Sequence, residues 1–174
     1  MPRATWLAVI AACILATAGV GCGARGPCED IALSAEAASS LAELDAASSF
    51  PIARPCAYEA EFEVGRVFAD ALPEQGRQHP RVNFSVHREG ERAFVLSQTE
   101  ATVPFLAIPL GSHRLQVEVD GRHAEGFAGP SGAGVDIAYL RWRRDGVTFE
   151  LAATLRPWLT ERDMQDLAAG MMER

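Results

Sequence analysis

Apolar and polar residues alternate with a period of two over much of the chain after residue 59. The apolar positions of three such stretches are Phe62 and Val64; Val82, Phe84 and Val86; and Leu115, Val117 and Val119. Successive side chains of a strand point to opposite faces of a sheet, so this alternation is typical of strands with one buried face. The pattern predicts an antiparallel β-sheet of about six to eight strands.

Short turns between these stretches set the expected strand pairing. Asp145-Gly146 and Asp120-Gly121 favour type I′ turns, and Glu89-Gly90 is a third two-residue turn. The Asp145-Gly146 turn places Trp142 opposite Phe149, Leu140 opposite Leu151 and Ala138 opposite Ala153 on one face. On the other face it places Arg141 opposite Glu150. The Asp120-Gly121 turn places Glu118 opposite His123 and Val117 opposite Ala124. The Glu89-Gly90 turn places Val86 opposite Ala93 and Phe84 opposite Val95. These registers keep apolar residues together on one face.

A helix is expected before the strands and another after them. The first is capped by Ser34, ends before Phe50-Pro51, and carries an apolar stripe of Leu33, Ala37, Leu41 and Leu44. The second is capped by Thr160, with Asp163 in the capping-box position, and its core-facing stripe is Met164, Leu167, Ala168 and Met171. We therefore expect an α+β fold in which an N-terminal and a C-terminal helix pack on a twisted antiparallel sheet of hairpins.

The N-terminus has the pattern of an export signal. Arg3 precedes an uncharged apolar run over residues 6–20, and Gly21-Cys22 follows it. This run of fifteen residues is shorter than the roughly 20 that a membrane-spanning helix needs, which disfavours an uncleaved anchor. Residues 19–22 resemble the lipobox of bacterial lipoproteins, which is cut before its cysteine. Ala16-Thr17-Ala18 offers the alternative of ordinary secretory cleavage before Gly19.

Cleavage at the lipobox would divide the chain into three parts. Residues 1–21 would be the signal peptide, residues 22–30 a tether, and residues 31–174 a single globular domain. Cys22 would carry the lipid, palmitate among its acyl chains, and hold the domain on a membrane surface. The expected location is the outer side of the cytoplasmic membrane, the periplasm or the outer membrane. Ordinary cleavage predicts a secreted soluble protein instead.

The compartment determines the expected redox state of the remaining cysteines. Cys13 lies in the signal, and Cys28 and Cys56 form a pair that an oxidising exterior favours as a disulfide. The alternative is two free thiols. A Cys-x-x-Cys motif and nearby histidines at ligand spacing are both absent from the sequence, so we expect no metal site.

A resemblance covers residues 140–171. A strand with Trp142, a turn at Gly146, Phe149 and Leu151 in the next strand, and a helix with Thr160 at its start and Ala168 within it occupy matching places. In this pattern the chain resembles an uncharacterised extracytoplasmic domain of bacterial anti-sigma factors and related lipoproteins. The resemblance implies the fold and an envelope location. It does not extend to sigma regulation, because we expect neither the cytoplasmic sigma-binding helices nor the membrane-spanning segment of an anti-sigma factor. Gly170 also stands where the family has Ser.

Composition excludes several kinds of partner and chemistry. The formal net charge is −7, which disfavours nucleic acid and anionic lipid headgroups because both need clustered positive charge. His79, His87, His113 and His123 have no ligand spacing, and Ser131 lies outside a nucleophile motif. The glycine-rich stretch 126–134 lacks the Gly-Lys-Ser/Thr ending of phosphate loops and is expected to be a flexible inter-strand loop. We expect no catalytic residues and no cofactor.

Residues 103–110 are apolar without a regular period. They are either a buried crossing segment or the lip of an apolar pocket that includes Phe105 and Ile108. The first reading favours a non-enzymatic exported lipoprotein that acts as a sensory or protein-interaction module with an envelope protein partner. The second favours a carrier of lipid or another small hydrophobic ligand in a cavity of the curved sheet.

Overall fold

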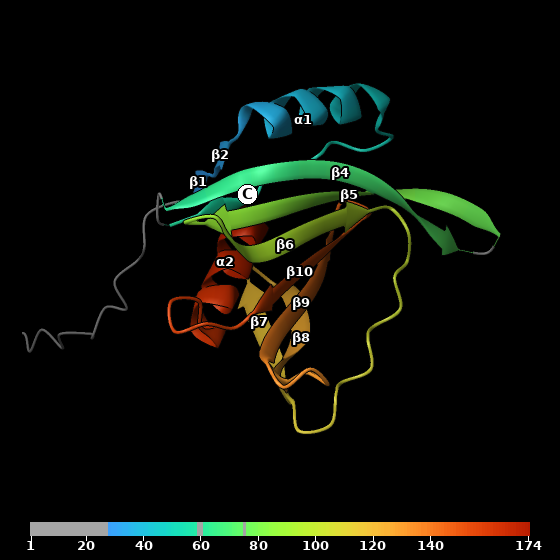
Figure 1. Ribbon diagram of the computed structural model, residues 1–174. Helices are drawn as coiled ribbons and strands as arrows, with labels where there is room; N and C mark the ends of the chain where they lie inside the picture. The colour runs from blue at the N-terminus through green and yellow to red at the C-terminus, as the bar shows by residue number, and fades with distance from the viewer. Residues whose placement is uncertain (1–27, 59–60, 75) are drawn as a thin grey trace, which may run out of the picture.

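The computed structural model describes residues 28–58, 61–74 and 76–174. In these ranges the elements are β1 (Glu29–Asp30), β2 (Ala32–Leu33), α1 (Ala35–Ala47), β3 (Cys56–Ala57), β4 (Phe62–Glu74), β5 (Arg77–Arg88), β6 (Glu91–Thr99), β7 (His113–Val119), β8 (Arg122–Pro130), β9 (Asp136–Arg144), β10 (Val147–Thr154) and α2 (Glu161–Glu173). The main sheet has eight strands in the order β2-β4-β5-β6-β10-β9-β8-β7 (Figure 1). Its pairs are antiparallel except for β2 with β4. The predicted α+β fold is confirmed.

The two Asp-Gly turns adopt the expected conformation. Asp120 and Asp145 both have φ of 50°, and Gly121 and Gly146 have φ of 74° and 84°. Positive φ at both central residues is the mark of a type I′ turn, whose twist matches that of the flanking strands. The pairings predicted for these two hairpins, from Glu118 with His123 to Ala138 with Ala153, are all present. Both registers are therefore confirmed.

The register of the third hairpin is different from the prediction. The pairs observed are Val86 with Phe94, Ser85 with Val95, and Phe84 with Leu96. The register shifts between Val86 and His87, where a β-bulge leaves Ala93 as an extra residue on β6. The predicted opposition of Val86 to Ala93 and of Phe84 to Val95 is wrong. The bulge brings the larger side chains of Phe94 and Leu96, each 1% exposed, onto the buried face.

The predicted glycine-rich loop is mostly strand. Residues 126–130 belong to β8 and pair with β9, so the turn is confined to residues 131–135. Gly126 is needed there because a Cβ at this position would lie 1.7 Å from the carbonyl oxygen of Tyr139. Gly129 has φ of +144° and lies against Ser112, where its Cβ would be 2.6 Å from the Ser112 Cα. These glycines permit close strand contact rather than flexibility.

The predicted cap of α1 is present. The Ser34 hydroxyl accepts a hydrogen bond of 3.2 Å from the N–H of Ala37 and donates one of 3.1 Å to the carbonyl of Gly65 in β4. Ala37 and Leu41 are buried, as their place on the predicted stripe requires. α1 thereby runs along β4 near one edge of the sheet (Figure 1).

α2 begins with the predicted capping box. Thr160 accepts from the N–H of Asp163, and the Asp163 carboxylate accepts from the N–H of Thr160 at 2.8 Å. The buried residues of α2 are Met164, Leu167, Ala168, Gly170, Met171 and Met172. They pack in one core with the sheet, so the predicted stripe faces the interior. No helix in the three described ranges is long and apolar enough to cross a membrane.

The sheet therefore has two different faces. The face toward α2, here the helix face, is apolar and on β9 includes Ala138, Leu140 and Trp142. Alternate residues of β9, namely Tyr139 and Arg141, lie on the opposite face. The chain between β6 and β7, drawn in yellow in Figure 1, passes on this opposite side, away from α2. We call this opposite side the strap face.

Candidate functional site

The candidate site is the strap face, which residues 103–110 cross as an irregular segment, here called the strap. Every residue of the strap is at least partly exposed. The expectation of a buried crossing segment is therefore wrong. Because the helix face of the sheet is already filled by α2, the apolar strap lies on the outside of the sheet, where it covers only a limited area.

One arginine of β9 holds the start of the strap. Arg141 donates through Nη1 to the carbonyl of Val103, and its guanidinium carbon lies 5.0 Å from the centroid of the Phe105 ring. The Phe105 ring also meets the Tyr139 ring edge to face at 6.1 Å. Just before the strap, the Thr148 hydroxyl donates to the carbonyl of Ala101 at 3.0 Å. The strap is thus fixed to β9 and β10 at its N-terminal end.

A polar groove lies on one side of this attachment. It has a volume of about 640 Å³, and its lining includes Thr102, Gln116, Glu118, His123, Glu125 and Arg143. The charges in it are largely paired, since Arg141 contacts Glu125 at 2.8 Å and His123 lies 3.8 Å from Glu118. The predicted His123–Glu118 pair is present. Arg141 lies opposite Glu150 as predicted, and its ion pair is with Glu125 on β8.

A second, more apolar groove lies on the other side. It has a volume of about 310 Å³ and is lined mainly by Val95, Leu106, Phe127, Ile137, Tyr139 and Ala152. The Tyr139 ring stacks on Phe127 at 5.5 Å, and its hydroxyl donates to the Glu150 carboxylate. Burial, and then this hydrogen bond, raise the pKa of Tyr139 far above its usual range. Tyr139 therefore stays protonated and serves as a hydrogen-bond donor.

Large apolar side chains project from this side of the molecule. Leu110 is 100% exposed, Leu106 is 49% exposed, and Val135 in the turn before β9 is 42% exposed. The stretch 101–112 contains no charged residue. The exposed leucines Leu106 and Leu110 therefore belong to an uncharged segment that lies beside a groove of paired charges.

The predicted ligand-pocket residues lie beside the grooves. Phe105 contacts Arg141, which lines the polar groove, and Tyr139, which lines the apolar one. Ile108 is half-buried in the strap. The strap residue that lines the apolar groove is Leu106. The roles of Leu106, Tyr139 and Arg141 were not predicted, since the aperiodic stretch 103–110 is the only feature of the sequence that indicates them.

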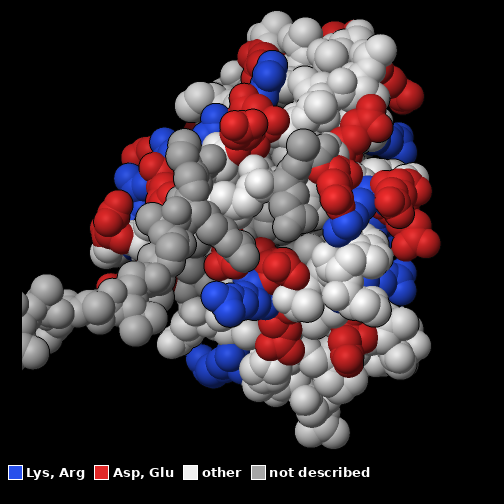
Figure 2. Space-filling model, turned by 90° about the vertical axis from the view of Figure 1, so that its left-hand side faces the viewer, with Lys and Arg blue, Asp and Glu red and all other residues white. Residues whose placement is uncertain are grey.

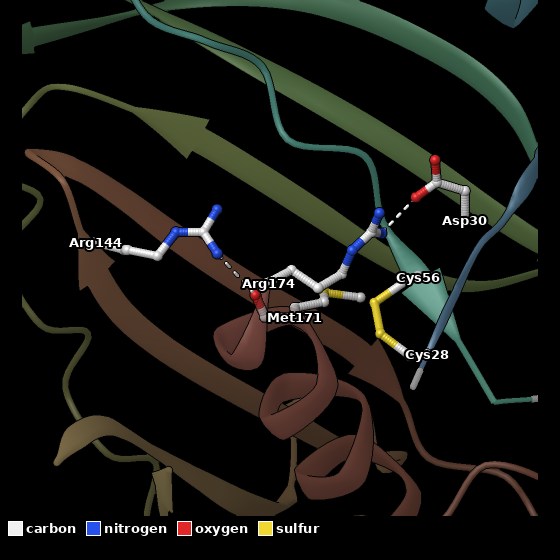
Figure 3. Close-up of a disulfide and its surroundings, with 6 residues drawn as sticks. All are labelled: Cys28, Asp30, Cys56, Arg144, Met171 and Arg174. Carbon is white, nitrogen blue, oxygen red and sulfur yellow. Dashed lines mark hydrogen bonds and ion pairs between the residues drawn. A yellow bond between two sulfur atoms is a disulfide. The ribbon is translucent and has the colours of Figure 1, made fainter. Parts of the chain in front are cut away.

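Cys28 and Cys56 are bonded to each other, as the disulfide alternative predicts. Cys28 and Cys56 form a disulfide with their Cα atoms 5.5 Å apart, beside the antiparallel pair β1 and β3. It packs against Gly170 of α2, where a Cβ would lie 2.8 Å from the Cys28 sulfur. Figure 3 shows the disulfide next to the end of α2. The proposed lipid site, Cys22, lies outside the described residues.

The other titratable residues singled out in the sequence are dispersed. His79, His113 and His123 each pair with a different glutamate, namely Glu74, Glu161 and Glu118. His87 lies 3.0 Å from the Ser85 hydroxyl. In residues 28–58, 61–74 and 76–174, no three His, Cys, Asp or Glu side chains converge as metal ligands would.

Comparison with known proteins adds no relative, since no family model, curated protein or solved structure matches this chain.

Proposed function

We propose that this chain is a non-enzymatic, exported lipoprotein whose globular domain acts as a protein-interaction module of the cell envelope. The anchoring part of the proposal rests on the apolar run before Cys22. The interaction part rests on one observation, the exposure of Leu106 and Leu110 on a strap that is fixed at its base. An apolar surface that is held in place loses little conformational freedom when a partner covers it.

The chemistry around the strap favours a protein rather than a lipid surface as the partner. Glu118 and Glu125 line the adjacent polar groove, with side chains 68% and 52% exposed. A membrane-binding loop is instead expected to combine apolar side chains with basic ones, because bilayers of the cell envelope carry anionic lipids. Apolar anchors with a rim of paired charges suit another folded protein, whose own polar groups can complement the rim.

Site-specific photo-crosslinking in the native cell envelope tests this proposal. A photoreactive amino acid at Leu110 should give one discrete adduct, while the same group at Ala42, on the exposed side of α1, should not. The captured protein is then purified and its binding measured. The change Leu110→Glu should weaken that binding by about tenfold or more, the usual effect of losing an apolar anchor.

Two results would contradict the interaction function. One is an adduct pattern that is the same at positions 110 and 42. The other is a purified partner whose affinity does not change on Leu110→Glu. Folding of the variant is checked by circular dichroism, and no core contact is lost because Leu110 is fully exposed.

The apolar groove supports a second candidate, the carrier of a small hydrophobic ligand. Its volume of about 310 Å³ is near the lower end of the roughly 300–1,000 Å³ of small-molecule sites. Only a short or partly inserted apolar chain would fit. Native mass spectrometry of protein from its own envelope distinguishes the two functions, since a carrier retains a stoichiometric ligand that Leu106→Asp would displace.

A further inference from the structure

A small pocket at the C-terminal end of α2 gathers three arginines from distant parts of the chain. Arg54 precedes β3, Arg144 ends β9, and Arg174 follows α2. With Ala53, Leu96, Phe149 and Met171 they line a pocket of about 210 Å³, here called the arginine pocket. Figure 3 shows Arg144 and Arg174 on either side of Met171, next to the disulfide. The pocket has no part in the strap face.

The arginines exceed the acidic groups available to them. Arg54 and Arg174 share one carboxylate, that of Asp30, with Arg54 at 4.0 Å and Arg174 hydrogen-bonded to it. Arg144 donates to the carbonyl of Met171 at 3.2 Å and lies 3.8 Å from Asp145, whose side chain is 89% exposed. An ion pair that is so exposed is weak. Three guanidinium groups thus meet two carboxylates, those of Asp30 and Asp145, which leaves one excess positive side-chain charge at the pocket in a chain whose total is −7.

The size and donors of the pocket suit a small anion. Its volume of about 210 Å³ is below the range of drug-sized ligand sites. Guanidinium groups present forked donors that match phosphate oxygens in pairs. Two of them can turn toward a ligand, because the side chains of Arg54 and Arg174 are 50% and 43% exposed. Phosphate is one of the two anions, with carboxylate, whose paired oxygens match these donors.

The position of the pocket indicates a source of phosphate. Asp30, which contacts two of the arginines, follows Cys28 by two residues, and Cys28 follows Cys22 by six. Six residues span at most about 22 Å when fully extended. A lipid on Cys22 would therefore keep this end of the domain close to the membrane surface, within reach of phospholipid headgroups.

We infer that the arginine pocket binds the phosphate of an anionic phospholipid headgroup and so orients the domain on the membrane that holds it. This inference rests on the proposed anchoring at Cys22. It revises the expectation, drawn from net charge, that anionic headgroups are excluded as partners. Basic and acidic side chains alternate on the side of the molecule shown in Figure 2, without a broad basic surface. Since salt screens charges beyond about 8 Å, a local cluster can act in an acidic protein.

Calorimetric titration of the purified full-length chain in a neutral detergent tests the inference. The probes are dihexanoyl-phosphatidylglycerol, the zwitterionic dihexanoyl-phosphatidylcholine and inorganic phosphate, each kept monomeric. The phosphatidylglycerol should bind saturably at one site, and about tenfold more tightly than the other two. The double change Arg54→Gln with Arg174→Gln should weaken it about tenfold or more, because each arginine supplies charge-assisted bonds. Arg162→Gln, an exposed arginine at the start of α2, is the matched control.

Any other outcome contradicts a specific part of the inference. Equal affinity for inorganic phosphate would mean that the pocket recognises a free anion and not a lipid. Absence of saturable binding, or equal weakening by Arg162→Gln, would remove the anion site altogether. The intact mass of the same sample shows whether Cys22 is lipidated, so a failure of the anchoring proposal is seen separately from a failure of the pocket.

Discussion

Gly126 of β8 lies directly against the backbone of Tyr139 in β9, so that a Cβ at position 126 would be 1.7 Å from the Tyr139 carbonyl oxygen. The change Gly126→Ala must therefore move the two strands apart. Because a Cβ cannot overlap a backbone oxygen and the strand pairing must be disturbed, we expect a loss of more than about 2 kcal/mol in the free energy of unfolding. Urea unfolding followed by tryptophan fluorescence measures it.

The control for this substitution is Gly132→Ala in the turn between β8 and β9. A Cβ at Gly132 meets nothing within 4 Å. The control should change the unfolding free energy by less than about 0.5 kcal/mol. Equal effects of the two changes would show that β8 and β9 do not approach as closely as described.

The Cys28–Cys56 disulfide closes a loop with a sequence separation of 28. It restricts the unfolded chain and should stabilise the fold by about 3–4 kcal/mol in the chain-entropy model. We predict that a reducing agent lowers the urea midpoint of the wild-type chain. The same agent should have no effect on the Cys28→Ser and Cys56→Ser double variant. If the urea midpoint of the wild-type chain does not change on reduction, the disulfide contributes nothing to stability.

Arg141 is expected to determine how firmly the strap is held. Its side chain is only 18% exposed and contacts Val103, Phe105 and Glu125 at the same time. Arg141→Met should speed amide hydrogen exchange in residues 101–105 and cost about 1–2 kcal/mol of stability. Arg143→Met, an exposed neighbour two residues along β9, provides the comparison. If both variants exchange at the wild-type rate, the strap is held by other contacts.

Asp70 gives the stability a predictable dependence on pH. Hydrogen bonds from Arg81, at 2.8 Å to Oδ1, lower the pKa of Asp70 below its ordinary value of 3.8. A depressed pKa in the folded state stabilises the protein above the unfolded pKa, and this contribution is lost as the pH falls through the folded one. Between about pH 5 and about pH 2 the wild-type chain should therefore lose more stability than Asp70→Asn.

The comparison for Asp70 is Asp45→Asn, which alters an exposed residue of α1. This variant should follow the wild-type pH profile throughout the acid range. Identical profiles for Asp70→Asn and the wild-type chain would contradict a stabilising Asp70–Arg81 pair. Both profiles are obtained from urea unfolding at fixed ionic strength, because salt weakens partly exposed ion pairs.

The parts of the fold predicted from sequence are those that neighbouring residues determine. Asp145-Gly146 permits positive φ at two successive positions, and Thr160 with Asp163 satisfies the first N–H groups of α2. The turn and the helix cap each depend on no more than four consecutive residues, so they can be predicted without knowledge of the rest of the chain. The strand registers that depend on the Asp-Gly turns followed from them.

The wrong predictions concern contacts between residues that lie on different strands and are separated in the sequence. The bulge at Ala93 places Phe94 and Leu96, each 1% exposed, in the core opposite Val86 and Phe84. Nothing local to β6 indicates this. Gly126 was interpreted as flexible because its close contact, Tyr139, is distant in sequence. The arginine pocket was missed for the same reason, since its arginines come from three separate segments.

The central claim is that a lipid on Cys22 places this domain on a membrane, and the intact mass of the chain extracted from its own cell envelope tests it most directly. We predict a mature chain that begins at Cys22 and carries the added mass of its acyl groups, together with release of the Cys22→Ala variant from the membrane fraction. An unmodified chain that begins at Gly19, or a Cys22→Ala variant that stays membrane-bound, would contradict the claim.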